Sequence, residues 1–155
     1  MRLIAVGTRM PDWVDAACED YQRRFRPPWR LTLLELPAAR RGEGADAGAR
    51  ARASEGRQIL AQLSERERVF PLDEQGSELS TAELAAWLRS QQAGGADLAF
   101  IIGGADGLDS AVLARGERRW SLSRLTLPHG LARVVLMEQL YRAASLIGGH
   151  PYHRG

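Results

Sequence analysis

Residues 98–107 read LAFIIGGADG, and this segment is the clearest indication of the architecture. The five apolar residues 98–102 predict a strand that is covered on both faces. Gly103, Gly104 and Gly107 follow at its end, where a backbone without Cβ atoms can approach a ligand closely or adopt a positive φ. Because parallel α/β sheets bind ligands beyond the carboxyl ends of their strands, this turn is a candidate binding site.

Short apolar runs alternate with amphipathic segments on both sides of this strand. We expect strands at residues 2–6, 31–36, 68–72, 98–102 and 119–122. We expect helices at residues 12–25, 51–63, 81–91, 109–115 and 131–147. The third helix begins with the Ser80 and Glu83 pattern of a capping box. This order predicts one α/β domain over residues 1–155, with a mostly parallel sheet and helices on both faces.

The basic residues are unusual, because all 21 of them are arginine and the chain has no lysine. Arginine binds phosphate groups through two nitrogens and stacks on bases, so this composition is compatible with an RNA partner. Biased codon usage would explain the composition equally well. The Ala- and Arg-rich stretch 38–52 is correspondingly either a solvated loop or a basic arm that touches an RNA backbone.

The sequence excludes or disfavours several classes of protein. No apolar run approaches the ~20 residues of a membrane span, and the first residues lack a signal-peptide pattern, so we expect a cytoplasmic protein without a membrane partner. Cys18 is the only cysteine, which excludes an intrachain disulfide and predicts a small buried residue in a helix. The first predicted strand is followed by GTR at residues 7–9, not by the glycine cluster of a dinucleotide-binding fold. A chain without lysine also has no Walker motif.

Residues 121–129 read SLSRLTLPH and place three hydroxyl groups, a proline and a histidine between two apolar elements. Two interpretations of this segment are open. A loop of this kind can present backbone N–H and C=O groups to the edge of an adenine ring. Alternatively, Thr126 or His129 belongs to the capped start of the following helix.

The last helix and the tail carry further polar side chains. Glu138 and Arg142 are four residues apart in the order that favours an ion pair, so Arg142 either stabilises the surface or faces a substrate. The tail contains HPYHR at residues 150–154 and is either a solvated chain end or part of a site. Its histidines lack the spacing and the acidic or thiol neighbours of a zinc site, so we expect no metal.

Taken together, several segments resemble one family. They are AVGTRMPDWV at residues 5–14, IIGG at 101–104, SLSRLTLPH at 121–129, EQLYRA at 138–143 and HPYHR at 150–154. They are similar to the RlmH family, the 23S ribosomal RNA (pseudouridine-N3)-methyltransferases of the SPOUT superfamily. The resemblance extends over essentially the whole chain, and the segments follow the order of the family.

The resemblance implies a SPOUT-type knotted fold, with a trefoil knot in the C-terminal segment, and a homodimer. It implies S-adenosyl-L-methionine (SAM), bound in a bent form, as the methyl donor. The implied reaction is methylation of N3 of pseudouridine 1915 in the 23S rRNA of the assembled ribosome. The implied cofactor-binding residues are Leu72, Gly103, Gly104, Leu122, Ser123, Arg124, Leu125, Thr126, Leu127 and Pro128. The residues implied in catalysis or RNA contact are His129, Arg142, Tyr152, His153 and Arg154.

This reaction assigns hypothetical roles to the polar side chains. N3 of the base must lose its proton, and a neutral imidazole with a pKa of ~6.5 accepts one, so His129 or His153 is the candidate base. Arg142 and Arg154 would neutralise phosphate or the charge on the uracil oxygens. Tyr152 would stack on the extruded base. Two alternatives are a ribosome-associated protein that binds without catalysis, and a related methyltransferase that acts on tRNA.

Overall fold

The computed structural model describes residues 1–150 and 152 and contains a five-stranded parallel sheet in the order β2-β1-β4-β3-β5. The strands are β1 (Arg2–Val6), β2 (Thr32–Leu36), β3 (Arg68–Glu78), β4 (Leu98–Ile102) and β5 (Trp120–Ser121). The helices are α1 (Asp12–Arg24), α2 (Ala47–Gln62), α3 (Thr81–Ala93), α4 (Ser110–Arg115) and α5 (His129–Ile147). In the part of the chain described, no helix combines the length and the apolarity needed to cross a membrane.

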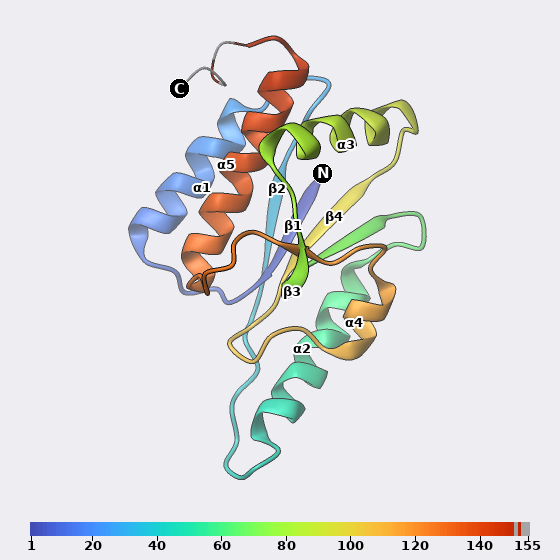
Figure 1. Ribbon diagram of the computed structural model, residues 1–155. Coiled ribbons are helices and arrows are strands. Elements are labelled where there is room, and N and C mark those ends of the chain that lie inside the picture. The colour runs from blue at the N-terminus through green and yellow to red at the C-terminus, as the bar shows by residue number, and fades with distance from the viewer. Residues whose placement is uncertain (151, 153–155) are drawn as a thin grey trace.

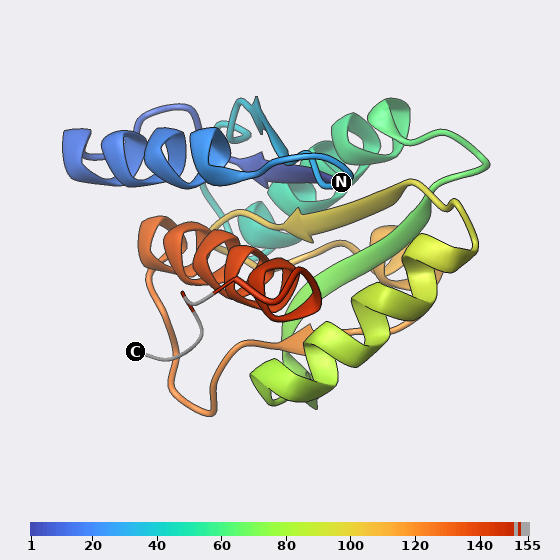
Figure 2. The same ribbon diagram turned by 90° about the horizontal axis from the view of Figure 1, so that it is seen from above.

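Helices cover both faces of the sheet, which confirms the predicted α/β class. α1, α3 and α5 lie on one face, and Figure 2 shows α5 between the other two, in contact with each. α2 and α4 lie together on the other face (Figure 1).

The residues of each strand point alternately to the two faces, which gives the sheet two hydrophobic cores. Leu3 and Ala5 of β1 pack into the core beneath α1, α3 and α5, together with Phe100 of β4. Ile4 of β1 packs into a smaller core with Ile59 of α2. All five side chains are at most 1% exposed, so the central strands are covered on both faces, as the apolar run 98–102 predicts.

Of the elements whose bounds differ from the predicted ones, three contribute to the candidate site or to its support. α2 begins at Ala47 and not at 51, so part of the Ala- and Arg-rich stretch is helical. β3 continues past the predicted end at 72 to Glu78, because its last residues pair with β5 after a break in the register. α5 begins at His129 and not at 131, because Pro128, with its restricted φ and an extended ψ of 145°, forms the N-cap.

Three local predictions are confirmed. The Ser80 Oγ accepts a hydrogen bond from the Glu83 N–H at 3.2 Å, and the Glu83 carboxylate accepts one from the Ser80 N–H at 2.7 Å, which completes the capping box of α3. Cys18 lies within α1 and is 2% exposed. Arg142 Nε donates to Glu138 Oε1 at 2.7 Å. The capping box and the ion pair depend on residues at most four positions apart, so spacing in the sequence is enough to predict them.

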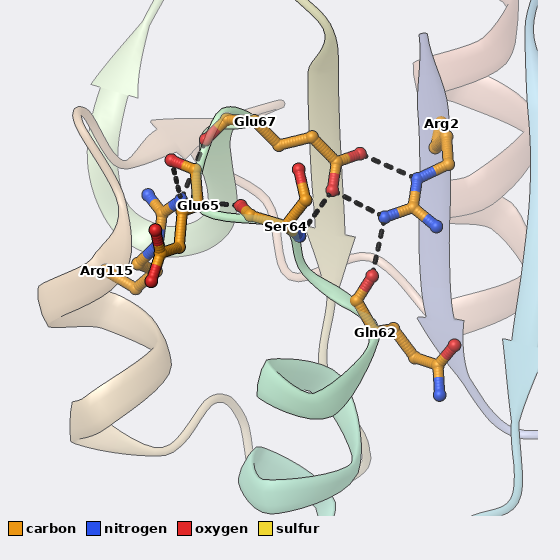
Figure 3. A network of polar contacts seen from close by, with 6 residues as sticks. All are labelled: Arg2, Gln62, Ser64, Glu65, Glu67 and Arg115. Carbon is orange, nitrogen blue, oxygen red and sulfur yellow. Dashed lines mark hydrogen bonds and ion pairs between the residues drawn. The ribbon is translucent and has the colours of Figure 1, made fainter.

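At the amino ends of the strands, a network of charged groups joins β1 to the connection between α2 and β3 (Figure 3). Arg2 donates to both carboxylate oxygens of Glu67 and to Gln62 O, each at 2.7 Å. Arg115 donates to the backbone oxygens of Ser64 and Glu67. The network lies at the edge of the sheet opposite to the candidate site described below, so we assign it to the stability of the fold.

Candidate functional site

A cavity of about 770 Å³, here called the carboxyl-edge pocket, lies beyond the carboxyl ends of β4 and β5 and beside residues 72–75 of β3. Its volume falls within the ~300–1,000 Å³ typical of small-ligand sites. Its walls are residues 72–75 of β3, residues 102–110 after β4, and most of residues 119–127. Ala49 and Arg52 of α2, Leu113 of α4, and His129 and Ala132 of α5 complete the lining. Parallel sheets bind ligands at this edge, so the pocket is the candidate site.

The glycine turn, residues 103–107, forms one wall and leaves no space for a side chain at Gly103 or Gly104. The Gly107 N–H donates to Gly104 O at 3.0 Å, and Gly107 has a φ of 82°. A Cβ atom on Gly103 would lie 2.8 Å from Gly107 O, a backbone atom that cannot move aside without opening the turn. The turn therefore requires glycine, and its backbone forms the surface of the pocket directly.

Residues 122–128 connect β5 to α5 and form the outer wall. The Ser121 hydroxyl donates to Ser123 O at 2.9 Å, and the Ser123 hydroxyl accepts from the Leu125 N–H at 2.9 Å. These hydroxyl groups therefore shape the loop itself. Of the predicted cofactor residues in this loop, Arg124 and Pro128 are not among the residues that line the pocket. Those that line it are Leu122, Ser123, Leu125, Thr126 and Leu127.

His129 is the first residue of α5 and lines the pocket, and no side chain caps this helix. One turn later, Arg133 is fully buried and holds this end of α5 to the sheet. Its Nη1 donates to Glu35 Oε1 at 2.6 Å, and its Nη2 donates to Val6 O at 2.9 Å and to Gly7 O at 2.7 Å. The imidazole is therefore presented from a helix end that is anchored to the carboxyl ends of β1 and β2.

Arg142 and Tyr152 lie toward the other end of α5, away from this pocket. Arg142 follows His129 by 13 residues (142 − 129), which is about 20 Å along an α-helix. Neither Arg142 nor Tyr152 lines the carboxyl-edge pocket. His153 and Arg154 lie outside the described residues. Within one chain, the described residues implied in catalysis therefore fall into two separate groups.

Tyr152 belongs to a group of side chains on α1 and α5, here called the aromatic–arginine cluster. Its ring meets Tyr141 edge-on, with 4.7 Å between centroids, and the Arg142 Cζ lies 4.9 Å from its ring centroid. Its hydroxyl oxygen lies 3.3 Å from Tyr21 Oη and 3.4 Å from Glu138 Oε1. Rings beside guanidinium groups suit the bases and phosphates of nucleic acids. The cluster comprises Tyr21, Arg24, Phe25, Tyr141, Arg142 and Tyr152.

The environment of Tyr152 determines the chemistry open to its hydroxyl. Burial, followed by the hydrogen bond with Tyr21, raises the pKa of Tyr152 to about 12. The hydroxyl therefore stays protonated at neutral pH and donates a hydrogen bond, for which Glu138 Oε1 is an acceptor. Tyr152 is thus unsuited to remove a proton at neutral pH.

The sequence did not predict two carboxylates beside the pocket. Glu55 of α2 is 6% exposed, and its Oε1 accepts a hydrogen bond from the Ala39 N–H at 3.0 Å. Asp106, within the glycine turn, forms an ion pair with Arg41. The hydrogen bond from Arg41, together with its charge, lowers the pKa of Asp106. In the sequence, neither carboxylate differs from the other acidic residues around it, so no local signal identifies them.

The fold and the pocket define an α/β protein with a cavity of small-ligand size at the carboxyl edge of a parallel sheet. Residues 1–153 match the family model described as "Predicted SPOUT methyltransferase", and the chain belongs to this family of enzymes. SPOUT methyltransferases use SAM as the methyl donor.

Full-length relatives confirm the resemblance found in the sequence. The chain is 52% identical over 154 residues to the ribosomal RNA large subunit methyltransferase H of Thiobacillus denitrificans, covering 99% of this chain and 98% of the relative. It is 48% identical to the protein of that name from Chromohalobacter salexigens, with 99% of each chain covered. It is 46% identical to the one from Psychrobacter sp., with 100% and 98% covered.

A solved structure supports the fold alone. It belongs to a probable methylase family protein from Haemophilus influenzae, which is 13% identical to this chain at a TM-score of 0.55. The similarity covers 97% of this chain and 69% of that one.

Proposed function

We propose that this enzyme transfers the methyl group of SAM to N3 of a pseudouridine in 23S rRNA, at position 1915, as a homodimer acting on ribosomes in the cytoplasm. The observation that carries the proposal is the carboxyl-edge pocket, whose walls come from the segments that the family resemblance assigns to the cofactor. The names of the full-length relatives support the large-subunit rRNA as the substrate class.

The pocket suits SAM in size and in chemistry. Its lining combines apolar side chains, among them Leu72, Leu122 and Leu127, with the backbone of the glycine turn. Apolar side chains pack against an adenine ring, and backbone N–H and C=O groups pair with its edge. Gly103, Gly104 and Gly107 carry no side chains, so a ligand in the pocket can approach their backbone atoms directly. When bound there, SAM supplies an electrophilic methyl group.

The residues of the chain position the base and remove its N3 proton. His129 presents its imidazole at the pocket, so it accepts the proton that N3 releases. Arg142 supplies positive charge for the negative charge that develops on the uracil oxygens. Tyr152 stacks on the base with its hydroxyl protonated. Positioning of reactants is worth up to ~7–11 kcal/mol in favourable cases.

These roles require two copies of the chain, because His129 and Arg142 lie about 20 Å apart along one helix. A homodimer that brings the aromatic–arginine cluster of one copy to the pocket of the other would complete the site. Exposed apolar side chains support such a contact, since Leu125 of the pocket lining is 75% exposed and Trp13 of α1 is 56% exposed. The trefoil knot that the resemblance implies stays a prediction.

Complementation between two inactive variants tests the shared site. His129→Ala removes the imidazole at the pocket, and a second variant lacks residues 152–155. In a randomly reassociated mixture, each mixed dimer holds one intact site, which predicts recovery of about a quarter of the wild-type activity. Activity is measured on ribosomes from a deletion strain, by mass spectrometry of the target nucleotide. Absence of recovery in a mixture that contains mixed dimers would place the whole site within one chain.

Ribosomes from the deletion strain, together with calorimetry, separate the proposed function from two alternatives: a ribosome-binding protein without catalysis and a methyltransferase for tRNA. A protein that binds the ribosome without catalysis would leave the target nucleotide unmodified and would show no heat of binding with SAM or its demethylated product. A methyltransferase for tRNA would modify bulk tRNA and leave the ribosomes unchanged. Methylation of the ribosomal pseudouridine at N3 rejects both alternatives.

A further inference from the structure

Glu55 is a buried carboxylate beside the carboxyl-edge pocket that the reaction described above does not use. Its Oε1 accepts a hydrogen bond from the Ala39 N–H at 3.0 Å. Its Oε2 faces Gly104, because a Cβ atom on that glycine would lie only 2.4 Å from this oxygen. The next two atoms that this Cβ would meet also belong to the Glu55 carboxylate. One carboxylate therefore contacts two segments that are far apart in the sequence.

The same face of α2 supports the glycine turn along its length. A Cβ on Gly48 would lie 2.9 Å from Asp106 Oδ1, and one on Gly56 would lie 2.6 Å from Asp109 Cβ. Arg52 Nη1 donates to Asp106 O at 3.3 Å. Positions 48, 52, 55 and 56 share one side of an α-helix, so α2 forms a continuous support for residues 104–109.

Residues 37–46, here called the arginine loop, connect β2 to α2 and are attached at the same place. Ala39 binds to Glu55, and Arg41 pairs with Asp106 of the glycine turn, with Nε 3.0 Å from Oδ2. Arg40 and Arg41 are exposed, and Asp106 lines the rim of the pocket. The glycine turn thus bounds the cofactor pocket and also holds a loop whose side chains suit an RNA backbone.

We propose that Glu55 is a positioning residue that holds the glycine turn and the arginine loop in one arrangement, and so couples the binding of SAM to the placement of the loop for RNA. The inference rests on the proposed function in taking SAM as the ligand of the pocket. A buried carboxylate that loses its hydrogen-bond donor is costly, so the contact with Ala39 keeps the loop in place. The coupling is reciprocal, so bound SAM stabilises the loop.

Glu55→Ala tests this role through affinity and through protease sensitivity. It should weaken SAM binding about tenfold or more in calorimetry, because fewer molecules then hold the turn in its binding form. It should also speed tryptic cleavage after Arg40 and Arg41, read by mass spectrometry of the peptides. SAM should slow this cleavage in the wild type and not in Glu55→Ala. Glu55→Gln keeps an acceptor for the Ala39 N–H and should stay within about threefold of the wild type in both measurements.

Gly104→Ala tests the contact from its other side. Its methyl group would collide with the Glu55 carboxylate, so it should reproduce both effects of Glu55→Ala. In the Glu55→Ala background, the space is vacated, and Gly104→Ala should change the SAM affinity by less than about twofold further. If the losses of SAM affinity caused by the two substitutions add fully, the contact between Gly104 and Glu55 is not the cause of either loss.

Glu67→Ala is the matched control, because Glu67 is a carboxylate that is 8% exposed and lies at the opposite edge of the sheet. It should lower stability without changing the SAM affinity or the protection of the arginine loop by SAM. If the wild type does not bind SAM, the proposed function fails, while cleavage in the absence of SAM still shows whether Glu55 holds the loop. If the wild type binds SAM and Glu55→Ala matches it in affinity and in cleavage, the inference about Glu55 is wrong.

Discussion

Arg133→Met removes the polar group that anchors the start of α5. Methionine keeps an apolar chain of similar length in the core but makes none of the three hydrogen bonds of the guanidinium. Those bonds reach Glu35 Oε1 at 2.6 Å, Val6 O at 2.9 Å and Gly7 O at 2.7 Å. Arg133 is 0% exposed and the Glu35 side chain is 33% exposed, so water regains access to the carboxylate more easily than to the site that Arg133 leaves.

The expected loss of unfolding free energy in Arg133→Met follows from this difference in exposure. Removal of one partner of a buried ion pair costs about 3–5 kcal/mol of unfolding free energy. Because the Glu35 carboxylate is rehydrated in part, we expect the lower end of that range, about 3 kcal/mol. For a chain of 155 residues, this loss corresponds to a decrease in Tm of about 6–12 °C.

Urea and thermal unfolding at one fixed protein concentration measure the effect, because association of subunits also shifts apparent stability. Arg23→Met is the control, since it removes an exposed ion pair with Glu19 on α1 and should change the unfolding free energy by no more than about 0.5 kcal/mol. If Arg133→Met unfolds within about 1 kcal/mol of the wild type, the guanidinium does not anchor α5 and the argument is refuted.

Two further substitutions test the pocket and the opposite edge of the sheet. Gly103→Ala should weaken SAM binding about tenfold or more, because its Cβ would lie 2.8 Å from Gly107 O. Gly94→Ala is the control and should bind SAM like the wild type, because its Cβ would meet no atom closer than 3.5 Å. Equal SAM affinities of the two variants in calorimetry would contradict this prediction. Burial alone would raise the pKa of Glu67, but the hydrogen bonds from Arg2 and from the backbone at residue 64 outweigh it and lower the pKa. A lowered pKa of Glu67 stabilises the fold above the ordinary value of 4.5, and this stabilisation is lost as the pH falls below that value. Glu67→Gln should therefore reduce the dependence of the unfolding free energy on pH in that acidic range. Identical slopes of unfolding free energy against pH for the variant and the wild type would contradict this prediction.

The elements that were predicted well depend on residues close together in the sequence. β4 has the predicted bounds 98–102, because a strand buried on both faces is apolar at every position. The capping box at Ser80 was predicted because both of its hydrogen bonds span three residues. The extension of β3 to Glu78 was not predicted, because it depends on the pairing of Glu78 with Ser121, which is 43 residues away (121 − 78 = 43).

The candidate site also has features that the sequence predicts and features that it does not. Leu72 and the glycine turn could be expected at one edge, because parallel strands place their carboxyl ends together. The distance between His129 and Tyr152 was not expected, because it depends on the uninterrupted length of α5 and on what Tyr152 packs against. Glu55 was missed because its sequence neighbours do not show that it faces Gly104.

By itself, the sequence determined the alternation of strands and helices, the place of the glycine turn at the end of β4, and membership of the family through ordered motifs. These properties follow from periodicity and from short segments, which are read without knowledge of what packs where. Only the tertiary structure decided that His129 and Tyr152 lie toward opposite ends of one helix, and that Glu55 joins the glycine turn to the arginine loop. Those relations depend on contacts between segments distant in sequence, whose geometry is set by the packing of α2 and α5 on the sheet.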